Sequence, residues 1–568
     1  MFHTTRYISN AISWTRTLAG ACLLAAPLLF SCCNDIREWA EPIVTDQGEY
    51  SNLTLVLNVN SDPNNVTRTS DNPMGGEDGN GLRLGEHHEN DIENLCVFAF
   101  ADDSRVGVSN LNAETPVKYC RFVDGIAFRP TLANSFYGDV ISTEVNIQFE
   151  GKIVNGNDAF LVLANMGDVT ASVTKLGQIR DLLVSKTLTR PAAPEAPLAD
   201  CTLFAMANAN NSRSLGGRGT KDIPYRVAID LERTTARVDF WFQPTLADDN
   251  KPTNLPSTDL LGYKVVNRYD DTDQTGWMYI SHIKLMNVAR YAPYAMKRLA
   301  QRESDQPTYL ADEEHLNDEA TQYVLEPHTW DKGKVGLVTY EQLYGNTRIQ
   351  YVSANAPGCF TTREAVRNYT TPQTYPNASD GFNQGWSKDR ISGEAYYVLD
   401  YINENTVEKE YTSGLNTTSL LLKTKFVPKQ MYYINGMTLD TKEASYGDTF
   451  WAMEKYDGAQ RVKLYFQDQA AAEMYKTIHS EATYAAPVEY TGGDNYYTIW
   501  IRHDNNGNDA LIGRMEYGIV RNNIYRIGVS KVLGPGSPMP TADENPEDIN
   551  LHIYVRKWNF MSVPTINI

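Results

Sequence analysis

Short segments in which apolar and polar residues alternate recur along the chain, and this pattern most constrains the fold. In residues 53–59 (LTLVLNV), every second residue from Leu53 onward is apolar, and residues 236–242 and 551–555 follow the same rule. A period of two places the apolar side chains on one face of a β-strand. Clusters of Asn, Asp, Gly and Pro separate these segments. The sequence therefore predicts an all-β fold of antiparallel sandwiches with few, short helices.

Further strands and one helix are expected from the same patterns. The strands are expected at residues 95–100, 145–149, 160–164, 225–231, 280–288, 395–401, 419–426, 462–466, 496–502 and 524–529. The helix is expected at residues 468–479, where Met474, Tyr475 and Ile478 suit one packed face. Residues 243–256 contain three prolines and several acids, which is typical of a linker. We therefore expect one domain at 69–245 and another at 246–568.

The charge balance excludes several kinds of partner. The chain of 568 residues has 51 basic and 70 acidic side chains, a formal net charge of −19. Nucleic acid requires a basic surface, so it is not expected as a partner. An anionic membrane surface would also repel this protein. Attachment to a membrane therefore requires a dedicated anchor.

The first 33 residues supply such an anchor. Arg6 and Arg16 precede an apolar run at 18–30, which is too short for a permanent transmembrane helix and is typical of a secretory signal, here residues 1–31. The tetrapeptide LFSC at 29–32 resembles a bacterial lipobox, in which the cysteine is acylated. Cys32 is the expected lipidation site. The alternative is an ordinary signal peptide that is cleaved nearby.

Four cysteines lie beyond the signal, and they form no Cys-x-x-Cys pair: Cys96, Cys120, Cys201 and Cys359. Their spacing does not suit a metal site. We expect them to be small buried side chains, with a single disulfide left open. Asp271, Asp273 and Gly276 match the opening of a calcium loop, but His282 occupies the position of the bidentate glutamate. No metal and no cofactor is therefore expected.

No catalytic motif is found. Residues 216–221 (GGRGTK) lack the spacing of a phosphate-binding loop, so a turn is expected there. The chain has no His-Glu-x-x-His sequence and no Gly-x-Ser-x-Gly sequence. A glycosidase pair of carboxylates can be neither identified nor excluded in so acidic a chain. The protein is not expected to be an enzyme.

The two ends of the chain carry the most informative features. The strand at 53–59 is followed by a polar loop rich in Asp, Asn and Gly that contains Arg68. Such a loop is a good protease substrate, and cleavage there would separate the strand from the body. At the other end, Leu551, Ile553 and Val555 alternate with polar residues, and the chain stops at an apolar isoleucine. This terminal strand either pairs within its own domain or pairs with a partner.

Several ordered motifs resemble the fimbrillin family, the subunits of type V pili in Bacteroidales. They are IENLCVFAF at 92–100, FLVLANM at 160–166, RTTARVDF at 233–240, YINENT at 401–406, YGIVRNNIYRI at 517–527 and VRKW at 555–558. The resemblance implies two transthyretin-like β-sandwiches. It also implies a lipoprotein precursor at the Gram-negative outer membrane, from which an arginine-specific protease removes the first strand. An extended segment of the next subunit then fills the groove.

Mapped onto this chain, the resemblance assigns a role to each end. Cys32 is the lipidation site, residues 32–68 are the propeptide, and cleavage falls between Arg68 and Thr69, with Arg37 and Arg83 as alternatives. The removed strand presents Leu53, Leu55, Leu57 and Val59. The donor strand has six candidate inserting residues: Leu551, Ile553, Val555, Trp558, Ile566 and Ile568.

The expected function is therefore a shaft-type subunit of a cell-surface pilus, joined head-to-tail to other subunits and supporting adhesion or biofilm formation. The alternative is an outer-membrane lipoprotein that stays monomeric, as a pilus anchor, a pilus tip or a glycan-binding module. The abundant tyrosines and tryptophans would suit glycan stacking in that case.

Overall fold

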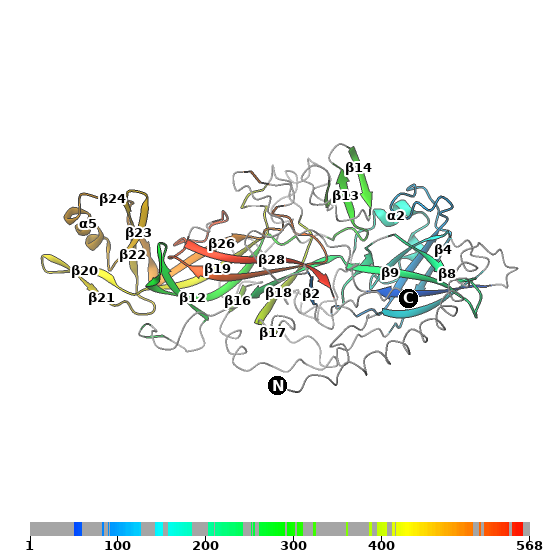
Figure 1. Ribbon diagram of the computed structural model, residues 1–568, viewed down its shortest axis with the longest axis horizontal. Coiled ribbons are helices and arrows are strands. Elements are labelled where there is room, and N and C mark those ends of the chain that lie inside the picture. The colour runs from blue at the N-terminus through cyan, green and yellow to red at the C-terminus, as the bar shows by residue number, and fades with distance from the viewer. Residues whose placement is uncertain are drawn as a thin grey trace, which may run out of the picture.

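The computed structural model describes most of residues 50–559; the longest segments left out are 59–81, 127–141, 185–202, 310–321, 325–358 and 362–385. The molecule is elongated (Figure 1). An N-terminal sheet lies at one end, a larger C-terminal sheet occupies the middle, and a small sheet with one helix forms the other end. Within the described residues, no helix is long and apolar enough to cross a membrane.

The N-terminal sheet has eight strands in the order β4-β3-β6-β7-β9-β1-β5, with β8 paired to β6 and β9. Their bounds are β1 Tyr50–Asn58, β3 Leu95–Phe100, β4 Tyr119–Val123, β5 Ser142–Glu150, β6 Ala159–Ala164, β7 Met206–Asn208, β8 Ser212–Gly216 and β9 Tyr225–Arg233. Strands β1, β5 and β9 pack against β3 and β6 through one shared apolar core. The sheet therefore folds over itself into two layers.

Strands β3 and β6 are buried on both faces. Alternate residues, such as Val97 and Val162, face the core shared with β1, while Phe98 and Leu161 face a second core. The short helix α2 (Leu176–Arg180) covers that second core. This double burial explains why 160–164 reads as a continuous apolar run rather than an alternating one.

The C-terminal sheet has eleven strands, eight of them in the order β17-β18-β10-β27-β11-β12-β19-β26. Strand β16 pairs with β12, while β28 pairs with β27 and β2. The bounds are β2 Leu82–Leu84, β10 Thr235–Trp241, β11 Leu261–Asn267, β12 Asp270–Met286, β16 Cys359–Thr361, β17 Trp386–Lys388, β18 Ala395–Asn403, β19 Ser419–Pro428, β26 Asp494–Trp500, β27 Asn523–Val532 and β28 Ile549–Asn559. A three-stranded sheet of β13 (Arg298–Gln301), β14 (Ser304–Tyr309) and β15 (Gln322–Val324) is separate from both large sheets, and β13 and β14 lie next to α2 (Figure 1).

Residues 431–490 form a distal module between β19 and β26. Its strands are β20 Met431–Asn435, β21 Thr438–Lys442, β22 Phe450–Asp457, β23 Gln460–Phe466, β24 Thr483–Tyr484 and β25 Val488–Tyr490. Helix α5 (Gln469–Ile478) lies within the expected range 468–479 and begins after Asp468, which caps it by accepting a hydrogen bond from the Ala471 amide. Tyr475 of α5 is buried, but Ile478 is exposed, so only part of the expected face is packed.

The all-β class is confirmed, and every strand expected within the described residues is present. The sheets are mixed, however, rather than purely antiparallel, because β1 pairs with β9 and β10 pairs with β27 in parallel. Parallel neighbours require long connections, and more than 160 residues separate β1 from β9. The chain passes between the two large sheets at Thr234, ahead of the boundary expected at 245. The division into two transthyretin-like domains stays a prediction.

The match to a calcium loop is wrong. Residues 270–286 form one long strand, β12, which pairs with β11 and β19. Asp271 forms an ion pair with Lys531, and Asp273 accepts a hydrogen bond from Asn267. Both acids lie where the β11–β12 register is irregular, and among the described residues no group of three or more His, Cys, Asp or Glu side chains could hold a metal ion there.

Candidate functional site: the first strand and the terminal strand

Strand β1 lies inside the N-terminal sheet, between β5 and β9. It pairs antiparallel with β5 over nine positions, from Tyr50 opposite Glu150 to Asn58 opposite Ser142. It pairs in parallel with β9 over six positions, from Leu53 opposite Tyr225 to Asn58 opposite Asp230. Removing β1 would therefore leave two unpaired strand edges facing each other, which is the template that an incoming strand requires.

The side chains of β1 complete the core of this end of the molecule. Leu53, Leu55 and Leu57 are buried against residues of β3, β5, β6 and β9. On the opposite face, the Thr54 hydroxyl donates to Asn146 Oδ1 (2.6 Å). Burying one leucine contributes ~1.5–3 kcal/mol, so these three together contribute roughly 5–9 kcal/mol before ordering costs. The strand thus fills an apolar groove that would otherwise be open to water.

A glycine-rich turn covers the start of β1. The Asn52 amide donates to the Gly219 carbonyl (2.9 Å), which lies in the turn between β8 and β9. Gly219 has a φ of +69°, and a Cβ there would lie 2.4 Å from the Tyr225 ring. The GGRGTK sequence is therefore a turn, as expected, and its Gly219 carbonyl is hydrogen-bonded to the first part of β1.

The segments on either side of β1 lie outside the described residues. They contain Cys32, Val59, Arg68 and Thr69, so the structure does not place the predicted lipidation and cleavage sites. Arg83, one of the alternative cleavage sites, lies in β2 opposite Trp558 of β28.

The terminal strand β28 pairs within its own subunit. It runs antiparallel to β27, with Leu551 opposite Val529, Ile553 opposite Ile527 and Val555 opposite Tyr525. Among the described strands, its other edge is paired only with β2, over Lys557–Asn559. Trp558 also lies in this strand, whereas Ile566 and Ile568 lie outside the described residues. Strand β28 is therefore held chiefly by one edge.

Between the two sheets lies a buried cluster of charges, here called the junction network: Glu89, Arg233, Arg237, Asp239, Tyr401 and Arg526. Arg237 contacts Glu89 (2.9 Å) and Asp239 (2.8 Å). Arg526 reaches Asp239 (3.1 Å), and the Tyr401 hydroxyl donates to Glu89 (2.5 Å). All of these side chains are at most 1% exposed. The charges therefore compensate one another out of reach of water.

Arg233 extends the network to the segment that follows β2. Its guanidinium donates to the Glu89 carbonyl (2.9 Å) and to Asn522 Oδ1 (3.1 Å). Burial lowers the pKa of Arg233 to about 10, although the charge of Glu89 opposes this shift. Glu89 thus ties the chain downstream of the polar loop to both sheets.

A second buried pair joins two of the motifs. Arg521 donates to both carboxylate oxygens of Glu404 (2.8 Å each) and to the carbonyl of Tyr294 (2.8 Å). Burial alone would lower the pKa of Arg521, but the Glu404 charge and hydrogen bonds outweigh it and raise the pKa. Both side chains are fully buried.

Residues 233–240, 401–406 and 517–527, three of the motifs that carry the family resemblance, therefore meet at this junction. The sequence did not predict that they meet. Asp239 alternates with Val238 and Phe240, which suggests a solvent-facing side chain, but β10 lies between β18 and β27 and is covered on both faces. The available signal was the pairing of arginines and acids within otherwise apolar strands.

The cysteines follow the expectation only in part. Cys96 is buried and free, and burial raises its pKa to about 11. Cys120 is also free but exposed, because its position on β4 faces away from the core; the expectation of burial is wrong there. Within the described residues, no group of three or more His, Cys, Asp or Glu side chains could hold a metal ion.

Comparison with known proteins gives one family match, confined to the C-terminal end. Residues 488–562 match the family model described as "Major fimbrial subunit protein type IV, Fimbrillin, C-terminal". Over these residues, the chain is similar to the C-terminal region of fimbrillins. The matched segment contains β26, β27 and β28, and thus the terminal strand together with the strand that holds it.

Solved structures of low similarity were also found. A fimbrilin (FimA) from Porphyromonas gingivalis is 13% identical, with a TM-score of 0.35, covering 90% of this chain and 98% of that one. The tip fimbrial protein Mfa3 from the same organism is 11% identical, with a TM-score of 0.31 and coverages of 90% and 100%. A putative cell adhesion protein from Bacteroides eggerthii is 12% identical, with a TM-score of 0.34 and coverages of 91% and 98%. No curated protein matches the chain.

The structural likenesses score below 0.5, so the similarity that carries weight is the family match at residues 488–562. That family is described as a major fimbrial subunit protein.

Proposed function

We propose that this protein is a fimbrillin, a shaft-type pilus subunit that polymerises by strand exchange after proteolysis. One observation carries the proposal: β1 is paired on both edges and buries three leucines, yet it precedes a polar loop through which a single cut would separate it from the body. A strand so placed leaves behind a groove of matching shape.

The position of the arginines supports Arg68 as the cleavage site. Cleavage at Arg37 would fall before β1 and leave it attached to the body. Arg83 lies in β2, whose backbone is paired with β28, whereas a protease requires an unpaired extended segment. Arg68 is the only Arg or Lys between residues 59 and 81.

Strand β28 is the proposed donor. Leu551, Ile553 and Val555 repeat the spacing of Leu53, Leu55 and Leu57. In its own subunit, β28 pairs with β27 over nine positions and with β2 over three. In the groove of a neighbour it would pair, as β1 does, with β5 over nine positions and with β9 over six. The groove therefore offers β28 more paired positions than its own subunit does, and each net backbone hydrogen bond contributes ~0.5–1.5 kcal/mol.

The remaining steps follow from the resemblance. Cys32 would anchor the precursor to the outer membrane through lipid, and an arginine-specific protease would release residues 32–68. The interface is head-to-tail, and such an interface generates a filament when it does not close into a ring.

A competing peptide tests this function. The chain from residue 34 onward is cut with a trypsin-like protease in the presence of excess peptide with the sequence of residues 50–58. We expect the peptide to occupy the groove and to suppress multimers in size-exclusion chromatography. The same peptide with Leu55→Asp should not suppress them, because a buried carboxylate is costly.

Two results would contradict the proposal. One is a chain that is cut at Arg68 and stays monomeric without any peptide, which would favour an anchor or a glycan-binding lipoprotein. The other is equal suppression by both peptides, which would show that the apolar groove does not select the strand.

A further inference from the structure

The connection between β27 and β28, residues 533–548, is attached to the body at many points. The Tyr497 hydroxyl donates to the Gly534 carbonyl (2.5 Å), and the Tyr490 hydroxyl donates to the Gly536 carbonyl (2.9 Å). Ser537 exchanges two backbone hydrogen bonds with Tyr496, each 2.8 Å long. These contacts come from β25 and β26, so the connection is held independently of β28.

The attachment continues to within a few residues of the terminal strand. The Thr498 hydroxyl donates to the Thr541 carbonyl (2.6 Å), and the Trp500 indole donates to the Ala542 carbonyl (3.1 Å). The Leu533 amide donates to the Asp548 carbonyl (2.8 Å), which closes the connection into a loop.

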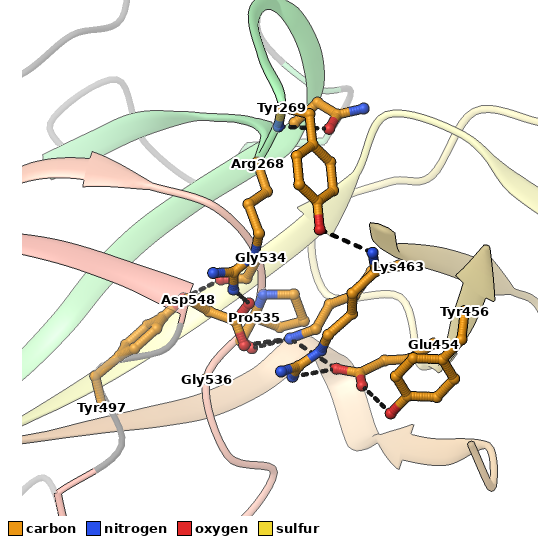
Figure 2. Close-up of polar contacts among 12 residues, drawn as sticks. Arg268, Tyr269, Glu454, Tyr456, Lys463, Tyr497, Gly534, Pro535, Gly536 and Asp548 are labelled. Atoms are coloured by element: carbon orange, nitrogen blue, oxygen red, sulfur yellow. Dashed lines mark hydrogen bonds and ion pairs between the residues drawn. The ribbon is translucent and has the colours of Figure 1, made fainter. Parts of the chain in front are cut away.

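Asp548, directly before β28, is the last of these fixed points (Figure 2). Its carboxylate forms ion pairs with Lys463 of β23 and with Arg268 of the β11–β12 turn, the latter at 3.3 Å. Lys463 also donates to the Pro535 carbonyl (3.3 Å). The Asp548 and Lys463 side chains are only 12% and 15% exposed, so solvent screens their attraction less than it screens a surface pair.

The distal module and the β11–β12 turn are braced against each other at the same place. The Tyr269 hydroxyl accepts a hydrogen bond from the Arg461 amide (2.8 Å), and Arg461 contacts Glu454 (2.5 Å). Figure 2 shows Tyr269 and Glu454 in the surroundings of Asp548. Three separate parts of the chain therefore converge on the residue from which β28 starts.

We propose that Asp548, held by Lys463 and Arg268, is the fixed pivot at which the terminal strand leaves its own body. This inference rests on the proposed strand exchange. Residues up to Asp548 stay attached in both the free and the assembled subunit, while residues from Ile549 onward change partner. Because the side chains of a strand alternate between its two faces, a fixed starting residue also sets which side chains can enter the neighbour.

Two engineered disulfides in the full chain, one before Asp548 and one after it, test whether the chain moves only after this residue. Tyr496→Cys with Ser537→Cys links an antiparallel pair before the pivot, and Lys531→Cys with Asn550→Cys links one after it. Paired strand positions have the Cα separation that a disulfide needs. After cleavage, we expect the first variant to polymerise within twofold of the unlinked chain. For the second variant, the amount of multimer should fall at least tenfold and should recover when the disulfide is reduced.

The possible results distinguish a failure of the pivot at Asp548 from a failure of the proposed strand exchange. If both disulfides block assembly reversibly, the connection itself must move, and the pivot is wrong although strand exchange stands. If neither blocks assembly, β28 is not transferred, and the proposed donor fails together with the pivot.

Hydrogen exchange in the uncut chain tests the ion pairs themselves. Asp548→Asn should raise the exchange rate of residues 549–551 at least tenfold without changing that of β19. The matched control is Asp271→Asn, which removes the exposed ion pair with Lys531 on the same sheet and should leave these rates within twofold. Unchanged exchange at 549–551 in Asp548→Asn, or an equal rise throughout the sheet, would overturn the assignment of Asp548.

Discussion

At the scale of single residues, the cost of a substitution depends on what surrounds the charge or methyl group that is lost. Glu404 and Arg521 are fully buried and satisfy each other, whereas Glu114 and Lys175 form an ion pair in solvent at a similar distance. Removing one partner of a buried pair leaves an uncompensated charge in the interior. The same chemistry is therefore expected to have very different consequences at the two sites.

Glu404→Gln tests this contrast. We expect it to lower the free energy of unfolding by about 3–5 kcal/mol, because Arg521 stays buried without its counter-charge. Glu114→Gln should change it by less than about 1 kcal/mol. Urea unfolding followed by tryptophan fluorescence measures both, and similar small losses would show that the junction does not depend on this charge.

Leu55→Ala tests the packing of β1. Truncating a fully buried leucine is expected to cost about 2–5 kcal/mol in the uncut chain, because the surrounding core closes only partly over the cavity. Val56→Ala, on the half-buried opposite face, is the matched control and should cost less. Once residues up to Arg68 are removed, the two variants should be indistinguishable from the native chain, and a persistent difference would mean that β1 stays bound.

Cys96 and Cys120, which are both free, should differ in reactivity. Burial raises the pKa of Cys96 to about 11, so little thiolate forms at pH 8, and the thiol is covered as well. Cys120 is exposed, although burial of its thiol and the charge of Asp168 raise its pKa too. Maleimide labelling with peptide mapping should modify Cys120 at least tenfold faster than Cys96, with the difference abolished in urea. Equal rates in the folded chain would contradict the placement of Cys96.

At the scale of elements, the sequence predicts where strands lie much better than it predicts what they pair with. Period-two patterns located β1, β10 and β28 to within a few residues, because alternation follows directly from one buried face. Pairing depends on long-range contacts that leave no local signal. The position of β1 between β5 and β9, and its parallel pairing with β9, therefore required the structure.

Some expectations failed for identifiable reasons. The acids near residue 271 match only the opening of a calcium loop, where no metal was expected, and in the structure Asp271 forms an ion pair with Lys531. The charges of the junction network lie in covered strands, where alternation no longer distinguishes inside from outside. The donor residues could be listed from their apolar pattern, and whether they enter a neighbour stays a prediction.

Glycines in turns provide a prediction about the element that covers β1. Gly219 and Gly436 both have φ near +65°, but a Cβ at Gly219 would lie 2.4 Å from Tyr225, whereas Gly436 has no atom within 4 Å. Gly436→Ala should therefore cost about 1 kcal/mol for backbone strain alone. Gly219→Ala should cost more and should also speed hydrogen exchange at the start of β1. Equal costs in thermal unfolding would mean that the turn relaxes without disturbing the strand.

At the scale of the whole molecule, the groove and the proposed pivot lie far apart along an elongated body (Figure 1). Strand β1 lies in the sheet at one end, whereas β28 starts beside the distal module toward the other end. In place, β28 runs from the side of the distal module toward the N-terminal sheet (Figure 1). Released and swung about Asp548, it would extend away from its own groove, which would favour insertion into a neighbour over self-closure. The buried junction between the two large sheets connects these sites through the body of the subunit.

The most direct measurement compares two chains after cleavage by a trypsin-like protease. One runs from residue 34 to Ile568, and the other ends at Asp548, so that it keeps the pivot but lacks β28. Native mass spectrometry and size-exclusion chromatography should show the loss of residues up to Arg68 in both. We expect a ladder of multimers for the first chain and only monomers for the second. A ladder from both chains, or from neither, would contradict assembly through the terminal strand.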